Sequence, residues 1–134
     1  MCFHSDLLKG QFYESLAIDR MLKTNKELKL TNRNNDYKYD FKLSNNLKYE
    51  VKYSGDATKY IFVEFYSWGK ASGITTSESD YYIFVLPEDK YLLIPTPILK
   101  SLCEYSKWDK EYGDRFKKGF LFLFDTLVSN GIFI

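Results

Sequence analysis

The chain has 134 residues, of which 45% are hydrophobic and 19% aromatic, and its formal net charge is +1. This length and apolar content predict a single domain over residues 1–134 that folds without a structural metal or a disulfide framework. The nearly neutral charge excludes a protein that binds nucleic acid by an excess of positive charge alone. It does not exclude a nuclease, because acidic metal ligands would offset basic groups elsewhere.

Cysteine and histidine usage restricts the chemistry further. Cys2 and Cys103 are the only cysteines, and His4 is the only histidine. A secreted chain of this size usually carries a disulfide framework, so we expect two reduced thiols and a cytoplasmic protein. A lone histidine excludes reactions that need a histidine pair, or a histidine beside serine or cysteine, and argues against a zinc site. Catalysis would therefore depend on carboxylates, lysine and hard metal ions.

Apolar segments are short throughout the chain. The first ten residues show no apolar run behind a basic start, so no signal peptide is expected. The longest apolar stretch, residues 119–124, is far too short to span a bilayer. We therefore expect no membrane partner.

Hydrophobic periodicity predicts the secondary structure. Residues 11–23 read as a helix, and residues 24–36 as loops around a short strand. Residues 37–43 and 47–53 alternate apolar and polar side chains on either side of Ser44-Asn45-Asn46, which predicts a β-hairpin. The remaining expected elements are strands at 59–68, 81–86, 90–94 and 119–124, a loop at 69–73, a helical turn at 75–79, a helix from 96 through 103, and a short helical turn before the last four residues. This order predicts an α+β fold with α/β-like character, in which helices flank a central mixed sheet of about five strands.

The hairpin carries the residues that point to chemistry. If its apolar residues share one face, Phe41 pairs with Tyr49, and Asp40 then faces Glu50 across the ladder. Two facing carboxylates repel each other, and a divalent cation between them would reverse the sign of that interaction. Lys52 lies one step further along the same face as Glu50. The alternative is an ordinary solvated hairpin face, on which Asp, Glu and Lys are common.

This arrangement suits phosphodiester hydrolysis. Asp40, Glu50 and the backbone carbonyl of Val51 would hold Mg²⁺ or Mn²⁺, which prefer hard oxygen ligands. A metal ion so held lowers the pKa of a bound water and neutralises the charge that builds on the phosphate. Lys52 would orient the attacking water or stabilise the same charge.

The run from Asp40 through Glu50-Val51-Lys52 resembles the motif of the PD-(D/E)XK nucleases, in which an Asp is followed, after a hairpin turn, by Glu-X-Lys. Its spacing is similar to that of small Holliday junction resolvases, notably the phage endonuclease I group. Residues 64–87 also resemble a segment of uncharacterised phage and viral proteins of that superfamily. The resemblance covers residues 10–100 and implies a restriction-endonuclease-like core, with Glu14 as a further catalytic acid in the first helix. Tyr39 stands where the motif has its Pro.

Further polar residues could assist such a site. Glu64 lies in the middle of an apolar strand and would complete the metal site or pair with a lysine. Lys70 and Ser72, in a glycine-flanked loop, suit a phosphate contact, although an exposed loop lysine is equally ordinary. Basic residues around 23–33 and 107–118 could flank a DNA path.

The sequence therefore predicts a metal-dependent, structure-specific DNA endonuclease, and the resemblance implies a Holliday junction resolvase from a phage or virus, acting in the host cytoplasm. Paired incisions of a junction would require a homodimer. Two alternatives stay open. One is a restriction- or homing-type endonuclease on duplex DNA, and the other is a non-catalytic nucleic-acid-binding protein with the same fold.

Overall fold

A computed structural model describes residues 3–33, 38–54, 59–67, 69–105, 109–111 and 117–134. Its helices are α1 (Phe3–Thr24), the 3₁₀ helix η1 (Gly73–Thr75), α2 (Thr96–Tyr105) and α3 (Phe124–Ser129). Its strands are β1 (Leu30–Arg33), β2 (Phe41–Leu43), β3 (Lys48–Tyr53), β4 (Tyr60–Ser67), β5 (Lys70–Ala71), β6 (Tyr81–Leu86), β7 (Lys90–Pro95), β8 (Asp109–Glu111), β9 (Lys117–Leu123) and β10 (Ile132–Phe133). No helix among these residues is long and apolar enough to cross a membrane.

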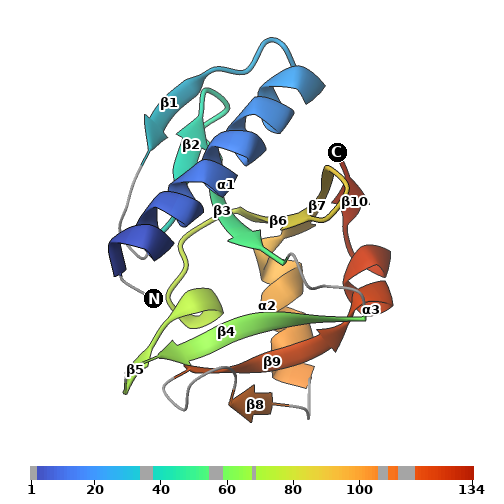
Figure 1. The fold of residues 1–134 in the computed structure, drawn as a ribbon. Helices are drawn as coiled ribbons and strands as arrows, with labels where there is room; N and C mark the ends of the chain where they lie inside the picture. Colours follow the sequence, from blue (N-terminus) through green and yellow to red (C-terminus); the bar gives the residue numbers. More distant parts are fainter. Residues whose placement is uncertain (1–2, 34–37, 55–58, 68, 106–108, 112–116) are drawn as a thin grey trace.

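The main sheet has six strands in the order β1-β2-β3-β6-β7-β10 (Figure 1). The β2–β3 hairpin pairs Phe41 with Tyr49, which is the predicted register. Its turn places Asn46 at a φ of 66°, and the side chain of Asn45 accepts a hydrogen bond from the backbone of Leu47 at 3.0 Å. Asparagine tolerates this left-handed backbone better than most residues, which explains the asparagine-rich turn.

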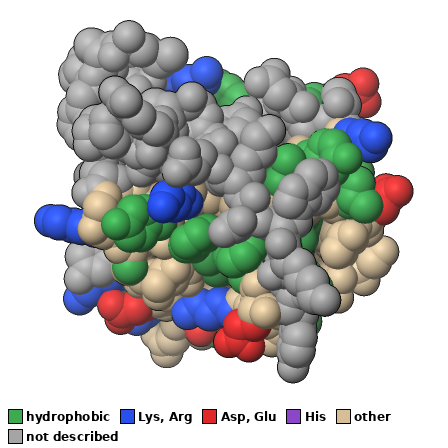
Figure 2. Space-filling model, turned by 90° about the horizontal axis from the view of Figure 1, so that it is seen from below, with side chains coloured by type: hydrophobic (Ala, Val, Ile, Leu, Met, Phe, Trp, Pro, Cys, Tyr) green, Lys and Arg blue, Asp and Glu red, His purple; other side chains and the backbone are tan. Residues whose placement is uncertain are grey.

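Strand β3 runs parallel to β6, and all other neighbours in the main sheet are antiparallel. The chain between these two parallel strands forms β4, β5 and η1 in place of a crossover helix. Strands β4 and β5 join β9 and β8 in a second sheet with the order β5-β4-β9-β8. Where this second sheet is seen from below, lysine and arginine side chains lie around hydrophobic ones (Figure 2).

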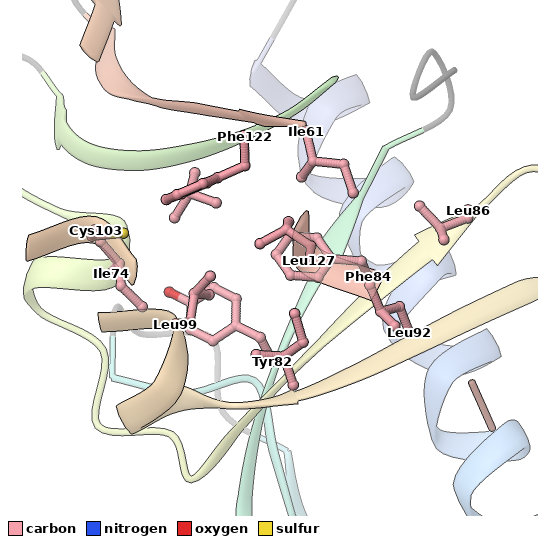
Figure 3. Packing of buried hydrophobic residues seen from close by; sticks show 12 residues of the cluster. Ile61, Ile74, Tyr82, Phe84, Leu86, Leu92, Leu99, Cys103, Phe122 and Leu127 are labelled. Carbon is pink, nitrogen blue, oxygen red and sulfur yellow. The ribbon is translucent and has the colours of Figure 1, made fainter. Parts of the chain in front are cut away.

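Two hydrophobic cores occupy opposite faces of the main sheet. The first lies under α1 and contains Ala17, Ile18, Met21, Phe41, Leu43, Tyr49, Val51, Ile83, Val85 and Tyr91. The second lies between the sheets and includes residues of α2 and α3. There Ile61 and Phe122 of the second sheet lie opposite Tyr82 and Phe84 of the main sheet (Figure 3). Because side chains alternate along β3, the placement of Tyr49 and Val51 under α1 directs Glu50 to the other face.

The α+β class and the mixed main sheet are confirmed, with six strands where about five were expected. The second sheet, which covers one face of the main sheet together with helices, was not predicted, and several element boundaries differ. The first helix begins at Phe3 and not at residue 11, β2 begins only at Phe41, residues 70–71 pair as a strand, and the helical turn expected at 75–79 is η1 at Gly73–Thr75. Cys103 is a buried free thiol, whereas Cys2 lies outside the described residues.

Candidate active site

The hairpin and α1 bring the predicted site residues together beside the main sheet. Asp40 immediately precedes β2, Glu50 and Lys52 lie on β3, and Glu14 lies on α1, which packs across the same strands (Figure 1). Glu14 and Glu50 are only 9% and 8% exposed. The face that carries Glu50 is therefore not the solvated surface that the alternating pattern alone would suggest, because the second sheet covers it.

Asp40 is fixed by the backbone of β3. Its N–H donates to the carbonyl of Tyr49 at 2.9 Å, and its Oδ2 accepts from the N–H of Val51 at 2.7 Å. Just before β2 begins, the Asp40 carboxylate thus accepts the hydrogen bond of a β3 backbone N–H, a place that a backbone carbonyl takes between paired strands. These two bonds hold the Asp40 side chain against the Glu50-Val51-Lys52 segment, as the predicted register requires.

Glu50 is a buried acid whose pKa lies far above its ordinary value. Burial raises its pKa from 4.5 to about 9; the positive charge of Lys52 opposes this rise, and the charge and hydrogen bond of Asp40 add to it. The Nζ of Lys52 lies 3.7 Å from Oε2 of Glu50. In the parallel register Glu50 is the neighbour of Tyr82, whose ring lies in the second core. At neutral pH and without metal, Glu50 therefore retains its proton.

Lys52 remains a cation at neutral pH. Its burial lowers its pKa, but the charges of Glu50, Asp40 and Glu64 outweigh that effect, so the pKa is raised. Its side chain as a whole is still 42% exposed. The lysine is suited to stabilise negative charge and not to accept a proton.

Glu14 joins the same group of charges from α1. Burial and the charge of Asp40 raise its pKa to about 7, while Arg33 and Lys52 lower it. The Nη2 of Arg33 lies 3.6 Å from Oε1 of Glu14, longer than a hydrogen bond, and among the described residues that oxygen has no hydrogen-bond partner. The ion pair with Arg33 was not predicted from the sequence, which placed Arg33 only among basic residues near a DNA path.

Of the three auxiliary residues, Glu64 and Ser72 hydrogen-bond to each other, and Lys70 lies on the short strand next to them. Glu64 on β4 accepts a hydrogen bond from the hydroxyl of Ser72 at 2.8 Å, and its charge raises the pKa of Lys52; its two predicted roles, completing the metal site or pairing with a lysine, stay predictions. Because the Ser72 hydroxyl donates its hydrogen to Glu64, it would have to break that bond to donate to a phosphate. Lys70 is exposed on the short strand β5, where it pairs with Ser67.

Gly73 explains why the segment after β5 can approach β4 so closely. Its φ is +54°, and a Cβ at this position would lie 2.2 Å from the carbonyl oxygen of Glu64. Only glycine fits both the left-handed backbone and this close approach. The Gly73 turn therefore holds Ser72 within hydrogen-bonding distance of Glu64.

The residues present fit a hard divalent cation. Within the part of the chain that the structure describes, a buried carboxylate oxygen of Glu14 lacks a hydrogen-bond partner, and Glu50 is kept protonated mainly by burial, so a cation would compensate both groups. Within the described residues, no three acidic, histidine or cysteine side chains are already arranged as a metal-holding group. The predicted set of Asp40, Glu50 and the Val51 carbonyl would combine two side chains with one backbone oxygen, and it stays a prediction.

No protein-family model matches the chain, and no significant match was found among curated proteins or solved structures. The resemblance to PD-(D/E)XK nucleases therefore rests on the motif residues themselves.

Proposed function

We propose that this chain is a metal-dependent DNA endonuclease that hydrolyses phosphodiester bonds. One observation carries the proposal. Asp40 raises the pKa of both Glu14 and Glu50, Glu14 and Glu50 are buried, and the charge of Lys52 lowers the pKa of both buried acids. Buried carboxyl groups with raised pKa values are costly to a fold, and such groups are concentrated at functional sites.

Each residue has a role that follows from its surroundings. Asp40, Glu50 and the carbonyl of Val51 would hold Mg²⁺ or Mn²⁺, and Glu14 would complete the negative environment from α1. The bound ion would supply a water of lowered pKa and would neutralise charge on the phosphate. Lys52, being protonated, would orient that water and stabilise the negative charge that develops on the phosphate oxygens.

The proposed substrate is branched DNA, with a four-way junction as the first candidate because of the resemblance to junction resolvases. A single domain leaves little surface for reading a sequence, which favours recognition of DNA shape. Symmetric cutting of a junction needs two active sites, so the proposal includes a homodimer.

The test is cleavage of labelled four-way junction, flap and linear duplex DNA in Mg²⁺, Mn²⁺ or EDTA. Asp40→Ala and Lys52→Ala should each lower the cleavage rate at least about 100-fold, because each removes a group that acts on the reacting phosphate or its metal. Matched controls are Asp125→Ala, an exposed acid in the first turn of α3, and Lys90→Ala, an exposed lysine at the start of β7. Both controls should cut like the parent.

The outcomes separate the alternatives. Paired, metal-dependent cuts in the junction support a resolvase, while cuts at a fixed position in linear duplex support a restriction-type enzyme. Binding of DNA without cleavage in any metal would replace the proposal with a non-catalytic binding protein. If Asp40→Ala and Lys52→Ala cut as fast as the two controls, the site is wrong.

A further inference from the structure

Two large apolar side chains of α1 are exposed beside the candidate site. Leu8 and Phe12, one helical turn apart, are 52% and 58% exposed. They line an open groove of about 530 Å³, whose other lining residues are Gln11, Ser15 and Arg33. The buried face of α1 packs on the first core, so core packing does not explain why Phe12 is apolar. An exposed phenyl ring in the wall of a groove that also holds a cation is instead typical of a binding surface.

Arg33 connects this groove to the acid cluster. Its guanidinium donates to the carbonyl of Gln11 at 3.3 Å and to the hydroxyl of Ser15 at 3.4 Å, and it lies 3.6 Å from Glu14. Its side chain is still 37% exposed. One guanidinium thus forms both a wall of the groove and a neighbour of the catalytic acid on α1, so a ligand in the groove would lie next to the proposed site.

Aromatic rings continue from the groove toward β3. Phe12 meets Tyr13 edge to face with ring centroids 5.3 Å apart, and Tyr13 stacks on Tyr53 at 3.8 Å. The ammonium of Lys9 lies 5.8 Å from the ring of Tyr53, which is 45% exposed. The stacked pair fixes Tyr13 and thereby supports Phe12, whose ring is the one that the groove leaves accessible.

We propose that this groove binds a single-stranded segment of the nucleic acid, with one unpaired base stacked on Phe12 and the adjoining phosphates near Arg33 and Lys9. Exposed aromatic rings flanked by cations are the general solution for single strands, because every base has a face that can stack and every nucleotide carries a phosphate. The inference rests on the proposed nuclease function. It narrows the substrate class to branched DNA with unpaired nucleotides beside the bond that is cut, which favours a flap, or a junction opened on binding, over a fully paired four-way junction.

Charge complementarity selects this occupant over a second copy of the chain. Arg33 lines the groove and Lys9 lies over the nearby ring of Tyr53; both cations would repel their own copies across a symmetric contact, whereas they attract phosphates.

The test compares binding of a fluorescein-labelled oligothymidine of about 12 nucleotides with that of a duplex of the same length, by fluorescence anisotropy in EDTA. Phe12→Leu keeps the apolar volume of the wall and removes the ring. It should weaken single-strand binding about tenfold and duplex binding much less, since a stacked base is lost only from the single strand. Phe133→Leu, at a phenylalanine that is 50% exposed on β10, is the matched control and should bind both like the parent.

Sedimentation of parent and Phe12→Leu proteins accompanies the binding assay. Equal single-strand binding by the two variants, or none by the parent, overturns the inference and leaves the cleavage test of the nuclease proposal unaffected. Dissociation of a parent dimer by Phe12→Leu also overturns it, because the groove would then be a contact between copies. Tight single-strand binding that depends on Phe12, in a protein that cuts nothing, supports the groove and refutes the nuclease proposal.

Discussion

Neutralising Glu50 is expected to remove most of the pH dependence of stability in the metal-free protein. Glu50 is 8% exposed, and its pKa in the folded chain is about 9 against an ordinary 4.5. Between these two values the folded chain keeps a proton that the unfolded chain has lost. The stabilisation is therefore fully present below about pH 4.5 and is lost as the pH rises toward about 9.

The size of the effect follows from this one proton. A one-proton difference lowers the free energy of unfolding by about 1.4 kcal/mol for each pH unit, so Glu50 accounts for a loss of about 3 kcal/mol between pH 6 and pH 8. Glu14, with a pKa of about 7, adds a smaller loss over the lower part of the same range. In Glu50→Gln only the Glu14 contribution remains, and near pH 6 the variant should match the parent because Gln resembles the protonated acid.

Urea unfolding followed by circular dichroism at pH 6, 7 and 8, in EDTA, measures these free energies. Glu78→Gln neutralises an acid whose side chain is 53% exposed, near Lys38, and should keep the parental slope. A parental stability that stays constant or rises from pH 6 to 8 would refute the reasoning, and so would an equally steep fall in Glu50→Gln.

Three further changes test other parts of the site. Mn²⁺ binding, measured by calorimetry in buffers of different ionisation enthalpy, should release about one proton at pH 7.5 because the ion must displace the proton of Glu50; binding without proton release would contradict this. Gly73→Ala should lower the free energy of unfolding by about 3 kcal/mol, since a Cβ there would strike the neighbouring β4 backbone at a φ of +54°. Gly10→Ala, where a Cβ would meet nothing within 4 Å, serves as its control, and equal stability of the two variants would be the contrary result. Arg33→Gln should raise the pKa of Glu14 above about 7, because the guanidinium of Arg33 lowers that pKa in the parent. A Glu14 pKa that NMR titration finds unchanged in the variant would contradict the ion pair.

The hairpin was predictable because its information is local. Alternating side chains and an asparagine turn fix both the register of Phe41 with Tyr49 and the proximity of Asp40 to Glu50. The strands at Tyr81–Leu86 and from Lys90 onward were predictable for the same reason, and so was α2 from Thr96. These elements carry their pattern within a few residues, and the short turns between them allow few alternatives.

The burial of Glu50 was not predictable, because it depends on a partner far away in the chain. Nothing in the alternation around Glu50 indicates that β4 and β9 will pair with each other and cover its face of the main sheet. Period-two patterning distinguishes the two faces of a strand but does not reveal whether the polar one meets water or a second layer. The contact of Arg33 with Glu14 was not predictable for the same reason, because it joins a strand to a helix that lies many residues earlier in the chain.

The pairing of β4 with β9 has a consequence for the order of folding. Strand β9 and α3, which contributes the fully buried Leu127, are translated after every central strand of the main sheet. A nascent chain that ends near residue 105 can form the hairpin and α1, but the core around its Tyr82 and Phe84 still lacks β9 and α3, which contribute Phe122 and Leu127. Such an intermediate exposes a wide apolar face and invites aggregation or chaperone binding until residues 117–134 arrive. The acid cluster is thus assembled early, and its low-dielectric surroundings are among the last features that the growing chain acquires.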